Sequence, residues 1–261
     1  MKKPKKSLGQ NFLIDKNIIK KIINITKVYN KNIIEIGPGQ GALTDEILTK
    51  KPKTLTLIEK DKNLFENLKK KYSKNIKVKI LNADILELNL ENFLKKDTII
   101  FGNLPFNISS QILVKIVKIK KWPPKFSNLI FMFQKELGEK ILGQFRSKNY
   151  GRLSILTNYT LNSQKKFYVT NNCFFPKPKV QSVVIHFFPK EKKTFKIRNI
   201  ENLEKVTNVL FSGKRKMINK NLKKLLNQSD IEKIPNIKFN LRPSEICPEI
   251  YYKITELYEK K

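Results

Sequence analysis

The sequence predicts an α/β fold, in which a Rossmann-like and largely parallel sheet carries helices on both faces and a small helical domain follows. In the first part of the chain, short apolar runs alternate with segments of helical periodicity, which is the rhythm of a parallel sheet with connecting helices. From about residue 188 that rhythm stops, and lysine-rich helical periodicity takes its place. This change predicts two domains, residues 1–188 and residues 189–261.

The predicted elements follow one another in a regular order. Asp15 is a predicted N-cap of a helix from Lys16 to about Tyr29, because an aspartate oxygen satisfies free N–H groups of the first turn. The predicted strands are Asn32–Ile36, Thr54–Glu59, Val78–Leu81, Thr98–Phe101, Leu129–Phe133 and Val183–Phe188. The helices predicted between them are Ala42–Lys50, Asp61–Tyr72 and Ile108–Ile119. Ligands of such sheets bind at the carboxyl ends of the strands, so the residues there are the candidates for function.

The chain is strongly basic. Its 261 residues carry a formal net charge of +32 at pH 7, which indicates a polyanionic partner and nucleic acid first of all. The chain is also crowded with Lys, Asn and Ile, a bias that AT-rich coding produces on its own, so the charge supports this partner without establishing it. Hydrophobic residues make up 40% of the chain, which is enough for a folded core.

Cysteine and histidine are scarce. Cys173 and Cys247 lie far apart without CxxC spacing, which argues against a disulfide framework or a structural zinc site and is typical of a reducing compartment. His186, the single histidine, lies in the alternating Val183–Phe188 stretch and is interpreted as a strand residue, so no metal site is predicted. No apolar run reaches the length of a membrane span, and no apolar h-region follows the basic N-terminus. We therefore expect a cytoplasmic protein.

A glycine-rich loop, Glu35–Gly41, stands at the end of the first predicted strand. Its sequence is Glu-Ile-Gly-Pro-Gly-Gln-Gly, and its glycines permit a tight turn and the close approach of a ligand. Gly37, Gly39 and Ala42 also fit the dinucleotide fingerprint GxGxxG/A. Glu59, about 20 residues further on, suits the ribose hydroxyls of a nucleoside cofactor. A nicotinamide dinucleotide (NAD) therefore stays open at this point.

Three features favour S-adenosylmethionine over NAD. Glu35 stands just ahead of Gly37, where a carboxylate can hold the amino-acid end of the ligand indirectly. Asp84 follows the third predicted strand and places a carboxylate where an adenine amino group arrives. The fourth strand supplies no hydride acceptor site and ends in a base-binding motif instead. The structural alternative is that each carboxylate only stabilises a nearby helix N-terminus, and the functional alternative is an NAD-dependent oxidoreductase.

The motif after the fourth strand is Asn103-Leu104-Pro105-Phe106. The amide oxygen of Asn103 and a neighbouring backbone carbonyl can accept hydrogen bonds from an exocyclic amino group, while the ring of Phe106 stacks on the base. An amide has no useful proton affinity at neutral pH, so Asn103 would orient an adenine amine and not act as a base. The structural alternative is an ordinary strand-to-helix turn, in which Asn and Pro are turn formers.

Seven segments of the chain together match one known family. They are Leu8–Leu13, Glu35–Gly41, Ile58-Glu59, Ala83-Asp84, Asn103–Ser109, Phe174–Val180 and the basic Phe211–Leu222 stretch. In these segments the chain resembles the ribosomal RNA adenine-N6,N6-dimethyltransferases of the small-subunit type, known as RsmA or KsgA. The similarity runs nearly end to end, which makes it specific.

The resemblance implies a class I methyltransferase sheet, S-adenosyl-L-methionine as cofactor, no metal, and a role for individual residues. The implied cofactor contacts are Asn11, Leu13, Gly37, Glu59, Asp84 and Asn103. The target adenine would be held by Asn103, Leu104, Pro105 and Phe106, with Phe174 closing on its other face. The implied RNA contacts are Lys5, Lys6, Lys214, Arg215 and Lys216, the last three on a basic C-terminal helix.

The implied reaction is the dimethylation of two adjacent adenines in the 3′-terminal hairpin of 16S-type small-subunit rRNA, within immature 30S-type particles and by a monomer. Two residues depart from the family pattern. Phe106 stands where the family has Tyr, and Lys214-Arg215 replaces a double Arg, which removes one forked phosphate contact. A sister group that methylates large-subunit RNA carries Ile where Leu104 stands, so Leu104, Asn107-Ile108-Ser109 and the Phe211–Leu222 stretch favour the small-subunit type. A non-catalytic nucleic-acid-binding relative is the alternative from another class.

Overall fold

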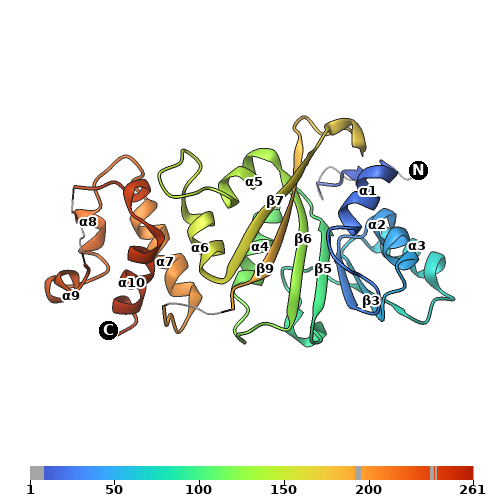
Figure 1. Ribbon diagram of the computed structural model, residues 1–261, viewed down its shortest axis with the longest axis horizontal. Coiled ribbons are helices and arrows are strands. Elements are labelled where there is room, and N and C mark those ends of the chain that lie inside the picture. Colours follow the sequence, from blue (N-terminus) through green and yellow to red (C-terminus); the bar gives the residue numbers. More distant parts are fainter. Residues whose placement is uncertain (1–8, 192–194, 236–237, 239, 261) are drawn as a thin grey trace. The chain divides into compact units, whose positions relative to one another are not determined.

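The structure is a computed structural model that describes residues 9–191, 195–235, 238 and 240–260 (Figure 1). The predicted RNA-binding residues Lys5 and Lys6 lie outside the described residues. The chain forms two compact units. The sheet unit comprises residues 1–115, 121–138 and 163–189, and the helical unit comprises residues 116–120, 139–162 and 190–261.

The helical unit takes up residues 139–162, which the predicted division at residue 188 assigned to the first domain. The reason is the packing of α6 (Arg152–Thr160) against C-terminal helices. The rings of Tyr159 and Tyr252 lie 5.1 Å apart, and the Tyr252 hydroxyl donates to the Ile155 carbonyl at 3.0 Å, across 97 residues of sequence. Contacts between residues so far apart in the sequence cannot be predicted from local composition.

The sheet unit is built on a sheet that has seven strands within the described residues, in the order β4-β3-β2-β5-β6-β9-β7. The strands are β2 (Asn32–Ile36), β3 (Thr54–Glu59), β4 (Val78–Asn82), β5 (Thr98–Asn103), β6 (Phe126–Gln134), β7 (Leu161–Val169) and β9 (Ser182–Pro189). The first five strands of this order pair in parallel, and β9 runs antiparallel to β6. The predicted largely parallel sheet is therefore confirmed, and the predicted strands correspond to β2, β3, β4, β5, β6 and β9.

The apolar runs of the central strands are buried because helices cover both faces of the sheet. In β5, for example, Thr98 to Gly102 are all buried, as expected for a parallel strand between two layers. On one face lies a cluster that joins strand residues such as Val184 to α1 (Lys16–Ile23), α2 (Ala42–Thr49) and α3 (Lys62–Tyr72). On the other face Gly138 of α5 (Lys135–Ile141) contacts Val183, whose side chain alternates with that of Val184. The helix α4 (Ser109–Val117) follows β5.

The first helix begins as predicted and ends early. The Asp15 carboxylate accepts hydrogen bonds from the N–H groups of Asn17 and Ile18, which confirms it as the N-cap. The helix then ends at Ile23 and not near Tyr29, because Ile25 N–H bonds to the Ile22 carbonyl in a tighter turn. Ile25 continues the apolar pattern beyond the last helical residue because it packs against the same core cluster, so the pattern extends further than the helix.

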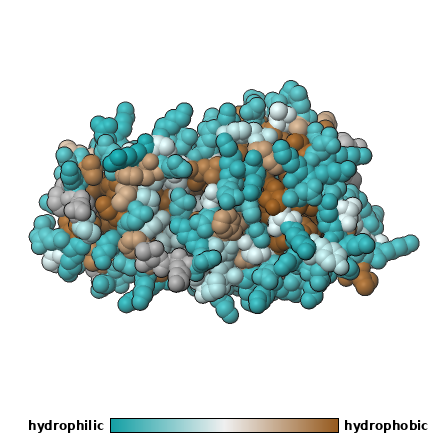
Figure 2. Space-filling model, viewed as in Figure 1, coloured by the Kyte–Doolittle hydropathy of each residue, from teal (hydrophilic) through white to brown (hydrophobic). Residues whose placement is uncertain are grey.

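The helical unit packs its helices around its own core. Its later helices are α7 (Ile200–Phe211), α8 (Asn219–Leu222), α9 (Gln228–Glu232) and α10 (Pro248–Tyr258), and it contains the 3₁₀ turn η4 (Pro243–Glu245). The 3₁₀ turns η2 (Leu90–Phe93) and η3 (Asn171–Cys173) belong to the sheet unit. Tyr251 is wholly buried in this core and its hydroxyl donates to the Pro243 carbonyl at 2.7 Å. Among the described residues no helix is long and apolar enough to cross a membrane. Most of the face drawn in Figure 2 is hydrophilic, in keeping with the high lysine content.

Candidate active site

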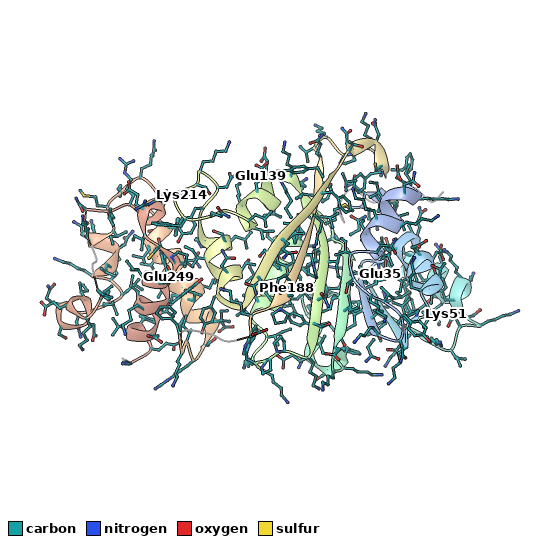
Figure 3. All side chains as sticks on the ribbon, viewed as in Figure 1. Glu35, Lys51, Glu139, Phe188, Lys214 and Glu249 are labelled. Carbon is teal, nitrogen blue, oxygen red and sulfur yellow. The ribbon has the colours of Figure 1, made fainter. Side chains whose placement is uncertain are left out.

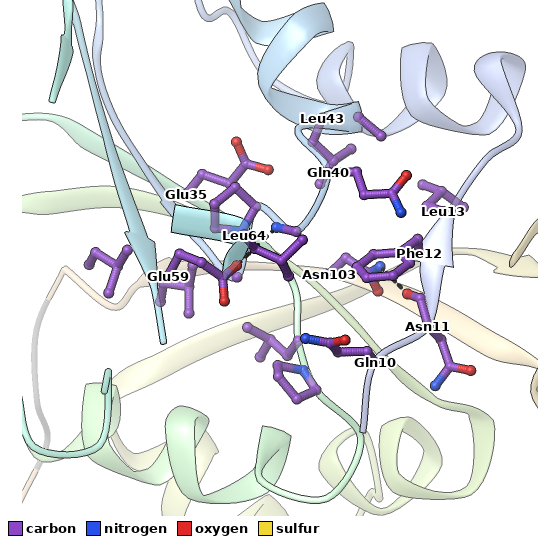
Figure 4. Close-up of a pocket in the computed structure, with 18 of the residues that line it drawn as sticks. Gln10, Asn11, Phe12, Leu13, Glu35, Gln40, Leu43, Glu59, Leu64 and Asn103 are labelled. Atoms are coloured by element: carbon purple, nitrogen blue, oxygen red, sulfur yellow. Dashed lines mark hydrogen bonds between the residues drawn. The ribbon is translucent and has the colours of Figure 1, made fainter. Parts of the chain in front are cut away.

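A cavity of about 570 Å³ lies in the sheet unit at the carboxyl ends of β2, β3 and β5 (Figure 4). This is the edge of a parallel sheet where ligands bind, and the volume suits a nucleoside-sized ligand. The cavity brings together residues from five separate segments of the chain. The predicted site residues that line it are Asn11, Leu13, Gly37, Glu59, Asp84, Asn103, Leu104, Pro105 and Phe106.

The glycine-rich loop after β2 takes backbone conformations that only glycine adopts easily. Gly37, Gly39 and Gly41 have φ angles of +67°, +60° and +85°. A Cβ atom at Gly39 would lie 3.0 Å from the Phe12 ring, so a side chain there would crowd both the ring and the cavity. The loop is tied to β3 by a hydrogen bond from Gly37 N–H to the Ile58 carbonyl at 2.9 Å. Its backbone is therefore held in place at the wall of the cavity.

Glu59 joins the loop to the start of α3. One carboxylate oxygen accepts the N–H of Gly39 at 3.1 Å, and the other accepts the N–H of Asp61 at 2.9 Å. The side chain is only 6% exposed, and this burial raises the pKa of Glu59, although the two backbone hydrogen bonds oppose the rise. Each oxygen keeps a second lone pair, so the carboxylate can hold the loop and still accept hydrogen bonds from a ligand.

Glu35 lies deeper, at the end of β2, and is 1% exposed (Figure 3). Its carboxylate accepts a hydrogen bond from the Thr44 hydroxyl at 2.6 Å. Burial raises the pKa of Glu35 to about 8, against the lowering effect of the Thr44 bond, and the negative charges of Glu59 and Asp45 add to the rise. At neutral pH the buried side chain is therefore mostly protonated.

Asp84 stands at the rim of the cavity after β4. Its carboxylate pairs with Lys60 at 2.6 Å and accepts the N–H of Leu86 at 2.9 Å, and these interactions hold the pKa of Asp84 below its usual range. Asn82, two residues earlier, donates its amide N–H to the Glu59 and Lys60 carbonyls at 3.0 and 3.2 Å. These bonds fix the loop after β4 against the end of β3.

Asn103 ends β5 and is held by the N-terminal segment of the chain. Its side-chain N–H₂ donates to the Asn11 carbonyl at 2.9 Å, which leaves the amide oxygen as the acceptor available on the side chain (Figure 4). Leu104 is buried, with 1% exposure, and its side chain anchors the motif in the core. Pro105 and Phe106 are half-buried and line the cavity.

The N-terminal segment Gly9–Leu13 lies along the cavity because a short ladder fixes it. Strand β1 (Phe12–Leu13) pairs antiparallel with β8 (Phe174–Phe175), with Phe12 opposite Phe175 and Leu13 opposite Phe174. Gln10 adds a hydrogen bond from its side-chain N–H₂ to the Asp61 carboxylate at 3.3 Å. The segment thereby closes one side of the cavity and brings Gln10 and Phe12 into its lining.

The whole chain matches one protein family. Residues 1–260 match the profile described as "Ribosomal RNA adenine dimethylase". The chain belongs to this family. It is also similar over nearly its full length to proteins named "Ribosomal RNA small subunit methyltransferase A". That of Pelagibacter ubique is 43% identical over 98% of this chain and 97% of its own length, and that of Malacoplasma penetrans is 41% identical over 95% of this chain and 90% of its own.

Solved structures share the fold. A dimethyladenosine transferase from Plasmodium falciparum superposes with a TM-score of 0.77 at 24% identity, covering 95% of this chain and 98% of that one. The 23S rRNA methyltransferase ErmE superposes with a TM-score of 0.67 at 22% identity, covering 95% and 99%. Together they confirm the predicted class I methyltransferase sheet with a helical C-terminal region.

Phe174 is one predicted site residue of the family pattern that the structure does not bring to the cavity. It is 3% exposed and packs in the core beside Leu13, and it is not among the cavity-lining residues. Its neighbour Phe175 is 45% exposed because adjacent residues of a strand point to opposite sides. The expected stacking of Phe174 on the target base would therefore require its ring to leave this core position.

The predicted basic helix of the family pattern is also different in the structure. Lys214, Arg215 and Lys216 lie in the turn between α7 and α8, and all three are exposed. Gly213 precedes them and ends the helical stretch, so the helix expected over 211–222 is reduced to the four residues of α8. In Figure 3 the labelled Lys214 side chain projects outward from this turn.

The sequence reasoning missed the cavity roles of Phe12 and Gln10. Both lie in the N-terminal segment that carried part of the resemblance, but no local pattern singled them out.

For metals, the described part of the chain contains no group of three or more His, Cys, Asp or Glu side chains arranged to hold an ion. His186 lies in β9 as predicted, and its ring contacts the Asn128 side chain at 2.7 Å.

Proposed function

We propose that this protein uses S-adenosyl-L-methionine to dimethylate the N6 amino groups of two adjacent adenines in the 3′-terminal hairpin of small-subunit rRNA. The observation that carries this proposal is the arrangement of one cavity. The glycine loop and two carboxylates form one side of it, and the amide of Asn103 lies on another. The family membership and the relatives named as small-subunit methyltransferases support the substrate. We further propose that the protein acts as a monomer on immature 30S-type particles in the cytoplasm.

The donor set of the cavity fits this cofactor. A Cβ atom at Gly37 would meet nothing closer than Pro105 at 3.8 Å, so the loop backbone there is open to close approach by a ligand. Glu59 keeps free lone pairs for ribose hydroxyls, and Asp84 offers an acceptor to an adenine amino group. When bound, the cofactor supplies an electrophilic methyl group on a sulfonium. Its positive charge would also favour the ionised form of the buried Glu35.

Asn103 would orient the nucleophile. The amino nitrogen of adenine is a weak nucleophile because its lone pair is delocalised into the ring. The Asn11 carbonyl holds the N–H₂ end of the Asn103 amide, which turns the amide oxygen toward the amine. A second acceptor, a backbone carbonyl of Leu104 or Pro105, would fix the direction of the lone pair and offset the positive charge that develops on the nitrogen.

Methyl transfer then needs only displacement in line. Asn103 and the backbone carbonyl would hold the amine in line with the methyl group that a bound cofactor would supply, so that the N6–C bond would form as the cofactor's S–C bond broke, and the amine would release its proton to water. The second transfer would begin from an amine with one hydrogen, so one of the hydrogen bonds to the two acceptors would be lost. This loss would weaken the binding of the base by about 1 kcal/mol. Stacking on Phe106 is unaffected by the first methyl group, and this contact would retain the base for the second transfer.

The experiment that tests the proposal is incubation of the protein with methyl-labelled cofactor and unmethylated immature small subunits, followed by mapping of the modified bases. We expect label in two adjacent adenines near the 3′ end. Competition between labelled cofactor and NAD in the same reaction tests the oxidoreductase alternative, because displacement of the labelled cofactor by NAD would favour it. Cofactor binding without any transfer to particles would indicate the non-catalytic relative, and label confined to large-subunit RNA would indicate the sister group.

A further inference from the structure

An exposed aromatic ring lies at one edge of the sheet unit, outside the cavity. Strand β7 is the last strand of the sheet order, next to β9, and its Tyr168 is 42% exposed. Large aromatic side chains at a strand edge usually turn toward the core, as Phe167 does in packing against the core cluster beside α1. Tyr168 points to the other side of the strand and stays in contact with solvent.

Two ammonium groups lie over this ring. The Nζ of Lys135 is 5.4 Å from the ring centroid of Tyr168, and the Nζ of Lys165 is 4.9 Å from it. Both distances are within the range of a cation–π contact. Within the described part of the chain neither lysine forms an ion pair, whereas Lys60, Lys71 and Lys118 each pair with a carboxylate. Two like charges therefore share one ring with no anion between them, which is an arrangement that an anionic ligand would stabilise.

The ring and its lysines are joined to the cavity through a continuous series of contacts. Lys135 N–H donates to the Gln181 carbonyl at 2.9 Å. Gln181 ends the loop 176–181, in which Lys177 and Lys179 are exposed. The loop begins directly after Phe175, and Phe175 pairs with the cavity residue Phe12. Lys135 is thus joined through Gln181 and the loop 176–181 to strand β8, which pairs with the cavity-lining segment.

We propose that Tyr168, Lys135 and Lys165 form an RNA-contact surface at the β7 edge, which holds a nucleotide outside the hairpin adenine in the cavity. The ammonium groups would contact phosphate and the ring would stack on a base or sugar, the combination by which proteins hold single-stranded or looped RNA. This inference rests on the proposed RNA substrate. Lysines alone could simply protect an edge strand from aggregation, but that role requires no exposed ring between them.

The test compares variants of the full-length protein in binding to unmethylated small subunits at several salt concentrations. For the Lys135→Ala/Lys165→Ala double variant we expect about tenfold weaker binding and a salt slope reduced by about 1 to 2. For Tyr168→Leu, which keeps every charge, we expect about tenfold weaker binding, and for Tyr168→Phe near wild-type binding. Affinity for the cofactor should not change in any of these variants.

The chain offers a matched control. Lys69 lies 5.5 Å over the Phe65 ring and Lys79 lies 5.7 Å over the Phe93 ring, and Lys79 is on β4, the opposite edge strand. The Lys69→Ala/Lys79→Ala variant loses the same charge, and we expect less than about a threefold effect. Equal loss in both double variants, or wild-type binding by Tyr168→Leu, would overturn the inference. A wild-type protein that neither binds nor methylates the particles would instead overturn the proposed function.

Discussion

The two sides of the cavity differ in how their polar groups are satisfied. On the side that we propose for the cofactor, called the cofactor side below, Glu59 bonds to two backbone N–H groups, Asp84 pairs with Lys60, and Glu35 bonds to Thr44. On the side that we propose for the target base, called the base side below, the Asn103 amide donates to the Asn11 carbonyl, and its oxygen remains available. Hydrogen bonds within the protein therefore hold the polar side chains of the cofactor side in place, whereas on the base side the oxygen of Asn103 remains available to a substrate.

Mutations on the two sides should therefore have different effects. Changes on the cofactor side should alter affinity for the cofactor and the stability of the fold, because the same groups support both. Changes on the base side should alter the rate of methyl transfer or its product, with the fold intact.

Asn103→Ala should lower the single-turnover rate of methyl transfer by about 10³-fold, because the acceptor that orients the amine is lost. Cofactor affinity should change less than tenfold and the melting temperature should not change. Asn103→Asp keeps an acceptor oxygen but loses the donor to the Asn11 carbonyl, so it should have an intermediate rate. Near wild-type turnover by a folded Asn103→Ala protein would remove Asn103 from the mechanism.

Glu35 should make the stability of the cofactor-free protein depend on pH. Its pKa is about 8 in the folded state and 4.5 in its unperturbed state, so between these values the folded state binds more protons than the unfolded state. The free energy of unfolding should therefore fall as the pH rises from 4.5 to about 8, by roughly 4 kcal/mol. Chemical denaturation of wild type and Glu35→Gln across this range measures it. Parallel pH profiles for the two proteins would contradict the assignment.

Glu59→Ala should weaken cofactor binding by roughly 30- to 100-fold, because a charged acceptor for ribose hydroxyls is lost. It should also lower the melting temperature, since the N–H groups of Gly39 and Asp61 lose their common partner. Calorimetry and thermal unfolding measure the two effects separately. Unchanged cofactor affinity with reduced stability would mean that Glu59 only supports the loop.

Gly39→Ala should destabilise the fold by about 1–2 kcal/mol, because an alanine at a φ of +60° is strained and its Cβ would meet the Phe12 ring. A Phe12→Leu change in the same protein should recover the part that comes from the ring but not the backbone strain. A double-mutant cycle in chemical denaturation measures this recovery. Simple additivity of the two changes would show that the ring and the loop are not in contact.

The strands around the site were predictable from the sequence, whereas the groups that close the site were not. Strands β2 and β3 are buried apolar runs bounded by polar residues, so local pattern alone defines their limits. The β1–β8 ladder pairs residues 12 and 175, and two-residue strands carry no periodicity. Strand β7 was missed because its sequence, LNSQKKFYV, is mostly polar at an exposed edge. The burial of Phe174 follows from the same ladder, in which it lies opposite Leu13. No local sequence pattern indicated that its ring is buried, so the sequence predicted a stacking role for it.

Phe106→Ala should have the smallest effect on rate and a clear effect on product. Loss of stacking should let the singly methylated adenine leave before the second transfer, so the product should shift toward N6-methyladenine. Nucleoside mass spectrometry of reacted particles measures the ratio of the two products. A wild-type protein that stops at the monomethyl product at long times would show that stacking does not retain the base.

The most direct test of the two-sided cavity is the binding of a bisubstrate ligand, in which adenosine is tethered through N6 to the sulfur end of the cofactor product. Calorimetry would compare it with S-adenosylhomocysteine, which occupies the cofactor side alone. For the wild type we expect the tethered ligand to bind more tightly. Asn103→Ala should abolish that gain, while Glu59→Gln should weaken both ligands equally and preserve it. Equal weakening of both ligands by Asn103→Ala, or no gain in the wild type, would contradict a single cavity that holds the cofactor and the base.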